Sequence, residues 1–278
     1  MKFGVLGPLA MTEEDTPEVC RLPPGPMTRQ LLGLLLLNAG CQVSLDSCVE
    51  ELWGDKPPRS AVQSVHTRIF QIRRAIAACP TIGGRDAAKQ LLVTHHHGYS
   101  LHIRPGSLDL HVLKHHLTRA REARLADDDP TVSTALRAAL ALWRGPTLAD
   151  VDAGAHIQAR RVGLEDLRMT LLEQRLDAEL RLGLHHELLA ELGMLAARHP
   201  VHENIHAQYM LALHRSGRSV QALDIYRAVR ATLLEELGME PSTRLRQLQR
   251  AILADSTDLE PAHHPAARPP ADSLTLVP

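Results

Sequence analysis

The chain has 278 residues with a formal net charge of -1, and hydrophobic residues fill 44% of its positions. This composition is typical of a soluble globular protein with room for two domains, and the balanced charge excludes a uniformly basic nucleic-acid coat. No run of about 18 apolar residues occurs and the amino terminus lacks a signal-peptide pattern, which predicts a cytoplasmic protein. The cysteines contain no CxxC pair, which argues against a zinc ribbon or a disulfide scaffold.

The first part of the chain begins with strand signals and continues with helix signals. Residues 2–22 predict short strands broken at turns, the last of them at Val19–Leu22. Thr28 is predicted to cap a leucine-rich helix that ends near Gly40. Ser44 is predicted to cap a second helix that ends at Gly54. Two short helices joined by a tight connection are therefore expected.

A third helix is predicted over Ser60–Ile76, started by a capping box of Ser60 and Gln63. Its apolar side chains recur three and four residues apart and predict one stripe against a core, made of Val62, Val65, Ile69, Ile72 and Ile76. No carboxylate lies between Asp55 and Asp86. The cations of this region are Lys56, Arg59, Arg68, Arg73, Arg74 and Arg85. The helix therefore presents a local positive field within an almost neutral chain.

Residues Leu91–Ile103 predict a β-hairpin that turns around His95-His96-His97-Gly98. Its predicted inward side chains are Val93, Tyr99, Leu101 and Ile103. Strands, three helices and then a hairpin are the order of a winged helix-turn-helix with an amino-terminal sheet, the OmpR type. In that arrangement the third helix enters the major groove of DNA and the hairpin, or wing, lies over the adjacent minor groove.

The pattern after residue 109 is helical. Helices are predicted over Leu110–Leu125, Val132–Trp143, Ala155–Leu182, His185–Arg198, Val201–Ser216 and Ser219–Leu237. Ala178, Leu182-Gly183 and Leu189 recur 34 residues later as Ala212, Ser216-Gly217 and Leu223, which is the period of tetratricopeptide-like helix pairs. The predicted fold is thus an α+β winged helix-turn-helix over 1–104 and an all-α tetratricopeptide-like domain over 109–256. Residues 258–278 are rich in Pro, Ala and His and predict a disordered tail.

Several motifs in both parts resemble one known family. In the first part they are FGVLGPL at Phe3–Leu9, LLLLNAG at Leu34–Gly40, ELWGDKPP at Glu51–Pro58, QIRRAI at Gln71–Ile76 and HGYSL at His97–Leu101. In the second part they are ALALWRGPTLADV at Ala139–Val151, the stretch Ala197–Arg227 and EELGMEPSTRLRQLQRAIL at Glu235–Leu253. Together they resemble the small Streptomyces antibiotic regulatory proteins (SARP family), which join an OmpR-type winged helix to a bacterial transcriptional activation domain.

The resemblance implies a pathway-specific transcriptional activator of a secondary-metabolite (antibiotic) gene cluster. Such a protein binds direct repeats in promoter DNA, with self-association on the repeats, and recruits RNA polymerase holoenzyme. No cofactor or membrane is implied, and without a GxxxxGK[ST] motif we expect no nucleotide control. One departure is the wing, where members often have a basic residue and Pro before the Gly-Tyr pair and this chain has His95-His96-His97.

The predicted DNA contacts fall into three groups. Base readout is assigned to the polar face of the third helix, namely Gln63, Thr67, Phe70, Gln71 and Arg74, with Arg74 suited to guanine and Gln71 to adenine. Phosphate contact is assigned to Lys56, Arg59, Ser60, Arg68 and Arg73. The wing contributes His95, His96, His97 and Gly98.

Other interpretations remain open at this point. Phe70 either contacts DNA or packs under the wing. The histidines of the wing suggest a metal only weakly, because adjacent strand residues face opposite sides and no fourth ligand is evident. No Ser-His-Asp or Cys-His pattern has the context of a nucleophile turn, so no enzyme is predicted. The rival function is a helical-repeat scaffold that binds a protein and whose winged helix does not bind DNA.

Overall fold

The computed structural model describes residues 1–13, 20–256 and 259. Contacts divide the chain into two compact units, and the division falls inside helix α7 (Ala155–Arg181), between Arg175 and Leu176. Within the described ranges, no helix combines the length and the apolar character needed to cross a membrane.

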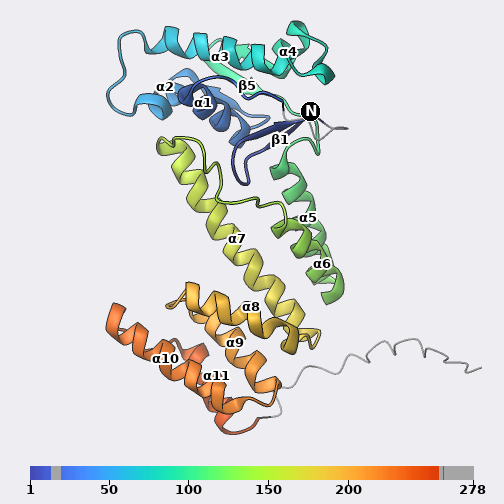
Figure 1. Cartoon of the computed structure of the whole chain (residues 1–278), viewed down its shortest axis with the longest axis vertical. Helices are drawn as coiled ribbons and strands as arrows, with labels where there is room; N and C mark the ends of the chain where they lie inside the picture. Colours follow the sequence, from blue (N-terminus) through green and yellow to red (C-terminus); the bar gives the residue numbers. More distant parts are fainter. Residues whose placement is uncertain (14–19, 257–258, 260–278) are drawn as a thin grey trace, which may run out of the picture. The chain divides into compact units, whose positions relative to one another are not determined.

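The first unit opens with two small strands and continues with helices and a second sheet (Figure 1). Its amino-terminal elements are β1 (Lys2–Gly4), β2 (Ala10–Thr12), α1 (Pro26–Leu37), β3 (Gln42–Ser44), α2 (Leu45–Trp53) and α3 (Ala61–Ala77). A 3-10 turn (Pro80–Ile82), α4 (Arg85–Leu91), β4 (Leu92–His95) and β5 (Gly98–Leu101) follow. The three predicted helices and the hairpin are therefore confirmed, whereas β3 and α4 were not predicted.

The second sheet has the order β3-β5-β4, and all of its pairs are antiparallel. In the hairpin His95 pairs with Gly98, so His96 and His97 form the turn. Tyr99 and Leu101 are buried as predicted, because β5 is the central strand. Val93 is only half-buried, and its neighbour Leu92 takes the core position that the prediction gave to Val93.

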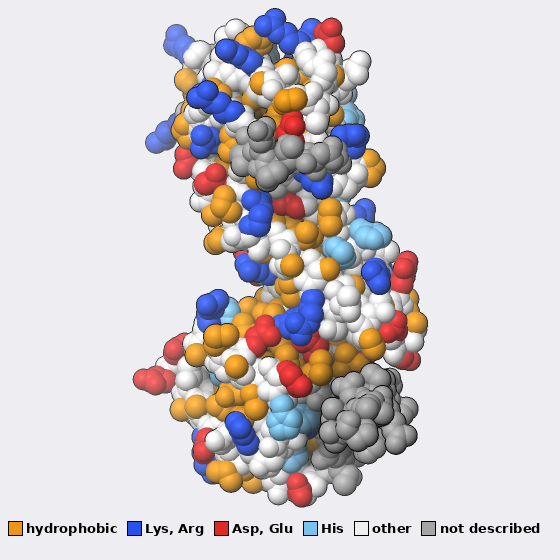
Figure 2. Space-filling view, turned by 45° about the vertical axis from the view of Figure 1, so that its right-hand side comes forward, with side chains coloured by type: hydrophobic (Ala, Val, Ile, Leu, Met, Phe, Trp, Pro, Cys, Tyr) orange, Lys and Arg blue, Asp and Glu red, His pale blue; other side chains and the backbone are white. Residues whose placement is uncertain are grey.

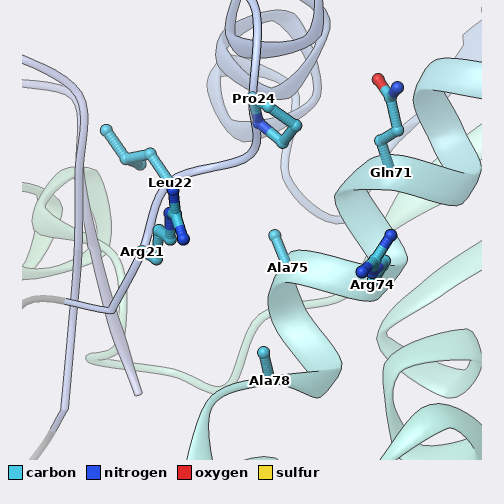
Figure 3. A pocket seen from close by; sticks show the side chains of 7 residues that line it. All are labelled: Arg21, Leu22, Pro24, Gln71, Arg74, Ala75 and Ala78. Atoms are coloured by element: carbon cyan, nitrogen blue, oxygen red, sulfur yellow. The ribbon is translucent and has the colours of Figure 1, made fainter.

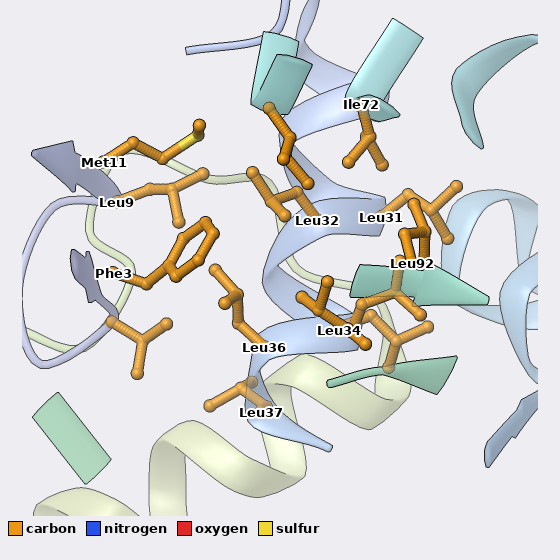
Figure 4. Packing of buried hydrophobic residues seen from close by; sticks show 14 of the residues in the cluster. Phe3, Leu9, Met11, Leu31, Leu32, Leu34, Leu36, Leu37, Ile72 and Leu92 are labelled. Carbon is orange, nitrogen blue, oxygen red and sulfur yellow. The ribbon is translucent and has the colours of Figure 1, made fainter. Parts of the chain in front are cut away.

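Helix α1 forms the centre of the first core. Six of its leucines are buried, at positions 31, 32, 34, 35, 36 and 37, so the helix is apolar all round as expected for a helix enclosed by other elements. Figure 4 shows Phe3, Leu9 and Met11 of the amino-terminal segment on one side of α1. Ile72 of α3 and Leu92 of β4 lie on the other side. Burial of these side chains fixes α3 and the wing to a common support.

Three local predictions in this part are wrong. Helix α1 begins at Pro26 after Gly25, so Thr28 lies inside the first turn and does not cap it. Ser60 precedes α3 but makes no side-chain cap bond, because its φ of -91° and ψ of 13° are not the extended conformation that a capping hydroxyl needs. The strand predicted at Val19–Leu22 is absent from its described residues, Cys20 to Leu22. The cap at Ser44 is confirmed, since its Oγ accepts from the Ser47 N–H at 2.9 Å.

The first unit continues past the predicted boundary at 104–109, with α5 (Asp109–Leu125), α6 (Asp129–Leu140) and the start of α7. The Asp109 carboxylate accepts from the backbone N–H groups of Val5 and Leu6 at 2.7 and 2.8 Å. Leu148 and Ile157 belong to the same core as the α1 leucines. Because packing is continuous across the predicted boundary, the division into 1–104 and 109–256 stays a prediction about function.

A buried carboxylate, Glu51, joins α2 to the start of α7. Its side-chain oxygens accept from the backbone N–H groups of Gly154, His156 and Ile157 at 2.6, 3.0 and 3.1 Å. The side-chain amide of Gln30 on α1 donates to it as well, at 3.0 Å. The first turn of a helix leaves N–H groups without partners inside the helix and carries a partial positive charge. The Glu51 carboxylate accepts hydrogen bonds from such N–H groups and places a negative charge beside the partial positive charge.

The second unit is helical, with the end of α7, α8 (His185–Arg198), α9 (Glu203–Arg215), α10 (Ser219–Leu237) and α11 (Thr243–Leu253). The helices predicted up to residue 237 are confirmed, and α11 was not predicted. Tyr226, Val229 and Leu233 of α10 pack with Met210 of α9 in the core of this unit. Most of the predicted tail lies outside the described residues.

The 34-residue repeat reappears as repeated backbone geometry. Gly183 and Gly217 both have a positive φ, 80° and 73°, which costs glycine little. One residue later, the Leu184 N–H donates to the Glu179 carbonyl and the Arg218 N–H to the Leu213 carbonyl, at 3.0 and 2.9 Å. Both turns thus end a helix with the same cap, in which an N–H reaches back five residues. The repeat found in the sequence is therefore a repeat of helix pairs joined by a glycine turn.

The cysteine thiols differ in accessibility. Cys41 is exposed, whereas Cys20, Cys48 and Cys79 are buried and unpaired. Burial raises the pKa of Cys48 to about 12, so its thiol stays protonated and poorly reactive at pH 8. We expect only Cys41 to react rapidly with a thiol reagent at pH 8. Colorimetric titration followed by peptide mass spectrometry checks this, with urea-unfolded protein as the control in which all four cysteines react.

Candidate nucleic-acid interface

Helix α3 presents one face to the core and another to solvent. Its buried residues are Ala61, Val65, Ile69, Ile72 and Ile76. Val62 was predicted to join this stripe, but 45% of its surface is exposed because Ala61 takes the core position in the first turn. Phe70 is 63% exposed on the outer face, so the alternative in which it packs under the wing is wrong. Phe70 is thus a large apolar side chain available for contact on the outer face of α3.

The outer face of α3 brings together most of the predicted base-reading side chains. Gln63, Thr67 and Arg74 are exposed with Phe70, and Gln71 is half-buried. Gln71 and Arg74 line one side of a pocket of about 320 Å³ that is closed on the other side by Arg21, Leu22 and Pro24 (Figure 3). Figure 2 shows Lys and Arg side chains gathering on the end of the first unit that carries α3. The surface is thus cationic, with an aromatic and two amides available for contact.

Two of the predicted phosphate contacts are engaged within the protein. The Arg73 guanidinium donates to the Leu92 carbonyl from Nε and Nη2, at 3.0 and 2.6 Å, and to Thr94 Oγ1 at 2.8 Å. Burial lowers the pKa of Arg73, but a guanidinium is so strong a base that it remains charged at neutral pH. Arg73 therefore ties α3 to strand β4 of the wing.

Arg68 is held on the opposite flank of α3. Its Nη1 donates to the Ser64 carbonyl at 2.9 Å, and its guanidinium carbon lies 5.5 Å from the centroid of the Trp53 ring on α2. Lys56, Arg59 and Ser60, by contrast, are exposed at the entrance to α3. Of the five predicted phosphate contacts, these three have no side-chain partner among the described residues and are placed to meet a phosphate directly.

The wing is built around a close backbone approach at Gly98. A Cβ atom on Gly98 would lie 2.0 Å from the Val43 carbonyl oxygen, so only glycine lets β3 pair with β5 here. His95 Nε2 lies 2.7 Å from Ser100 Oγ, which links the two strands of the hairpin. His96 and His97 are exposed at the tip with their ring centroids 4.1 Å apart. Within the described residues, no group of three or more His, Cys, Asp or Glu side chains is arranged to hold a metal ion.

Sequence reasoning missed two features of this surface. Thr28 Oγ1 donates to Gln71 Oε1 at 2.8 Å, a contact between α1 and α3 that no pattern along either helix contains. Helix α4 packs on α3 and carries the exposed cations Arg85 and Lys89. A signal that could have found α4 is its Asp86-Ala87-Ala88-Lys89 sequence, because Ala and Lys favour a helix.

Comparison with known proteins identifies the family. The family described as "Bacterial transcriptional activator domain" matches residues 108–253. The chain is 42% identical over 255 residues to the regulatory protein DnrI of Streptomyces peucetius, and the match covers 91% of this chain and 92% of that protein. The chain belongs to the Streptomyces antibiotic regulatory protein family. This SARP family consists of transcriptional regulators, so the chain is a transcriptional regulator and not an enzyme.

Other relatives agree with this SARP assignment. The regulatory protein AfsR of Streptomyces griseus is 35% identical over 268 residues, which cover 96% of this chain and 26% of that longer protein. A solved structure of Mycobacterium tuberculosis EmbR in complex with a low affinity phosphopeptide matches with a TM-score of 0.83 and 30% identity. That match covers 91% of this chain and 65% of the EmbR chain. It confirms the predicted fold, a winged helix-turn-helix followed by tetratricopeptide-like helices.

Proposed function

We propose that this SARP protein activates a secondary-metabolite gene cluster by placing α3 in the major groove of promoter DNA. The observation that carries the proposal is Phe70, which is 63% exposed on a helix face surrounded by cations. Thymine methyl groups in the major groove provide an apolar contact for such a side chain, and phosphates provide the counter-charge. The exposed wing tip at His96-His97 would lie over the adjacent minor groove.

Within this proposal the side chains have separate roles. Gln63, Thr67, Phe70, Gln71 and Arg74 contact bases, and Lys56, Arg59 and Ser60 contact phosphates at the entrance to α3. Arg68 and Arg73 keep α3 against α2 and the wing, and reach phosphate only with the N–H groups that these contacts leave over. His95 and Gly98 shape the hairpin, and residues 1–104 act as the DNA-binding module.

The remaining parts of the proposal concern partners. One winged helix reads few base pairs, so occupancy of direct repeats by self-associating copies is an economical route to useful affinity. Residues 109–256 would then contact RNA polymerase holoenzyme bound beside the repeats. A regulator that works on chromosomal promoters acts in the cytoplasm.

Footprinting tests the proposal directly. Full-length protein is incubated with the promoter regions of the genes next to its own, at two salt concentrations, and protected bases are mapped. We expect protected direct repeats whose occupancy falls as salt rises, because phosphate contacts release counterions. Absence of protected repeats, or binding that salt does not affect, would contradict the proposal and favour a protein-binding scaffold.

Two substitutions separate base readout from phosphate contact. Arg74→Ala is expected to weaken binding to the specific repeat by about 1 to 3 kcal/mol while leaving non-specific DNA almost unaffected. Arg59→Ala is expected to weaken both kinds of DNA alike and to reduce the salt slope by about 1, because one phosphate contact is lost. Fluorescence anisotropy with specific and scrambled duplexes measures both. Equal loss on the two duplexes for Arg74→Ala would remove Arg74 from the base-reading group.

A further inference from the structure

The side chain of Gln71 is held by a residue outside its own helix. Thr28, the third residue of α1, is buried with 3% of its surface exposed, and its hydroxyl donates to Gln71 Oε1 at 2.8 Å. Burial restricts the hydroxyl, so this hydrogen bond has a defined direction. It points the oxygen end of the Gln71 amide toward α1.

Gln71 stands between two hollows along α3. On one side it lines the pocket shared with Arg74 and Pro24 (Figure 3). On the other side it lines a hollow of about 400 Å³ shared with Thr67 and Thr28. In the part of the chain that the structure describes, Thr28 is the hydrogen-bond partner recorded for the Gln71 side chain. The orientation of the amide therefore depends on Thr28.

The two ends of an amide read different bases. Its NH2 group donates and its oxygen accepts. Adenine is read with both ends at once, because its major-groove edge offers an acceptor at N7 and a donor at N6. Guanine offers two acceptors, N7 and O6, and is suited to an NH2 group alone. With Oε1 engaged by Thr28, the donor Nε2 is the end of the Gln71 amide that is left for a base.

We propose that Thr28 is a specificity-determining residue that orients Gln71 to prefer guanine over adenine at one position of the DNA site. This inference rests on the proposed function, since it requires α3 to lie in the major groove. It also replaces the adenine preference that the sequence alone suggests for Gln71. Thr28 acts through Gln71 and does not itself touch the base.

The test is selection from a randomised duplex library with full-length protein, followed by sequencing. Wild type is compared with Thr28→Val, which keeps the shape and removes the hydroxyl, and with Thr28→Ser, which keeps the hydroxyl. Gln71→Ala identifies the position that Gln71 reads. The matched control is Thr134→Val, because within the described residues the Thr134 hydroxyl on α6 donates to the Pro130 carbonyl of its own helix.

We expect wild type, Thr28→Ser and Thr134→Val to prefer guanine over adenine by about fivefold at the position that Gln71→Ala randomises, the value of one oriented hydrogen bond. Thr28→Val is expected to lose this preference at that position alone. Three results would overturn the role of Thr28 and leave the proposed function standing. They are a wild-type preference for adenine at that position, an unchanged profile for Thr28→Val, and an unchanged profile for Gln71→Ala. A library that wild type leaves unselected would overturn both.

Discussion

Replacing Glu51 by Ala is expected to lower the free energy of unfolding of the first unit by about 3 to 5 kcal/mol, a large share of the stability of a typical domain. Glu51 is 2% exposed and accepts from three backbone N–H groups at the start of α7 and from the Gln30 amide. Its removal leaves those donors buried without an acceptor and opens a cavity beside Gly154. Helix α2 and the start of α7 would then separate more easily.

Tryptophan fluorescence during urea unfolding measures this change, because both tryptophans of the chain, Trp53 and Trp143, lie in the first unit. The matched control is Glu50→Ala. Glu50 is the neighbouring carboxylate and contacts His156 Nε2 at 2.9 Å, but its side chain is 57% exposed. Exposed pairs contribute about 1 kcal/mol at most, so Glu50→Ala should shift the midpoint little. Equal shifts for the two variants would show that Glu51 does not hold α7.

The second large effect is expected for Gly98→Ala, which should destabilise the first unit by about 3 kcal/mol and weaken DNA binding. The added Cβ would meet the Val43 carbonyl oxygen at 2.0 Å and the Ser44 Cα at 3.0 Å. Both are backbone atoms, so a side-chain rotation cannot relieve the overlap. The overlap is removed only if β3 separates from β5, and the wing then loses its pairing with β3.

The urea midpoint and the affinity for the specific duplex are measured for Gly98→Ala and for Gly163→Ala. Gly163 lies in α7 with nothing within 4 Å of an added Cβ, so its replacement should stabilise the helix by about 0.5 to 1 kcal/mol and leave DNA binding unchanged. A Gly98→Ala variant as stable as wild type would show that β3 is not required to pair with β5.

Predictions from the sequence were most reliable where a pattern repeats along one element. The leucines of α1, the stripe of α3 from Val65 to Ile76 and the helices of the second unit were found because a helix that packs on a core repeats every 3.6 residues. The glycine turns at Gly183 and Gly217 were found because a left-handed cap favours glycine. The break between α5 and α6 was also predicted, although its turn uses Asp127, with φ of 53°, in place of a glycine.

Elements and contacts that depend on a distant segment were missed. Strand β3 has only three residues and pairs with β5 far along the chain. Ser60 and Gln63 fit a capping box by spacing, but the backbone at Ser60 does not adopt the required conformation. Arg73 fits a phosphate contact by its place on α3, yet three hydrogen bonds commit it to β4. Short strands and long side chains are hard to predict from the sequence, because their positions depend on contacts with segments far away in the chain.

The amino-acid sequence was sufficient to place α3, the hairpin and the helical repeat, and to indicate the family. Each of these follows from periodicity, turn residues or motifs that lie within one segment. The contacts of Glu51 with the start of α7, of Arg73 with the wing and of Thr28 with Gln71 became visible in the folded chain alone. A hydrogen bond between segments depends on how their cores pack, and that packing places a buried hydroxyl of α1 beside the amide of α3 that we propose reads DNA.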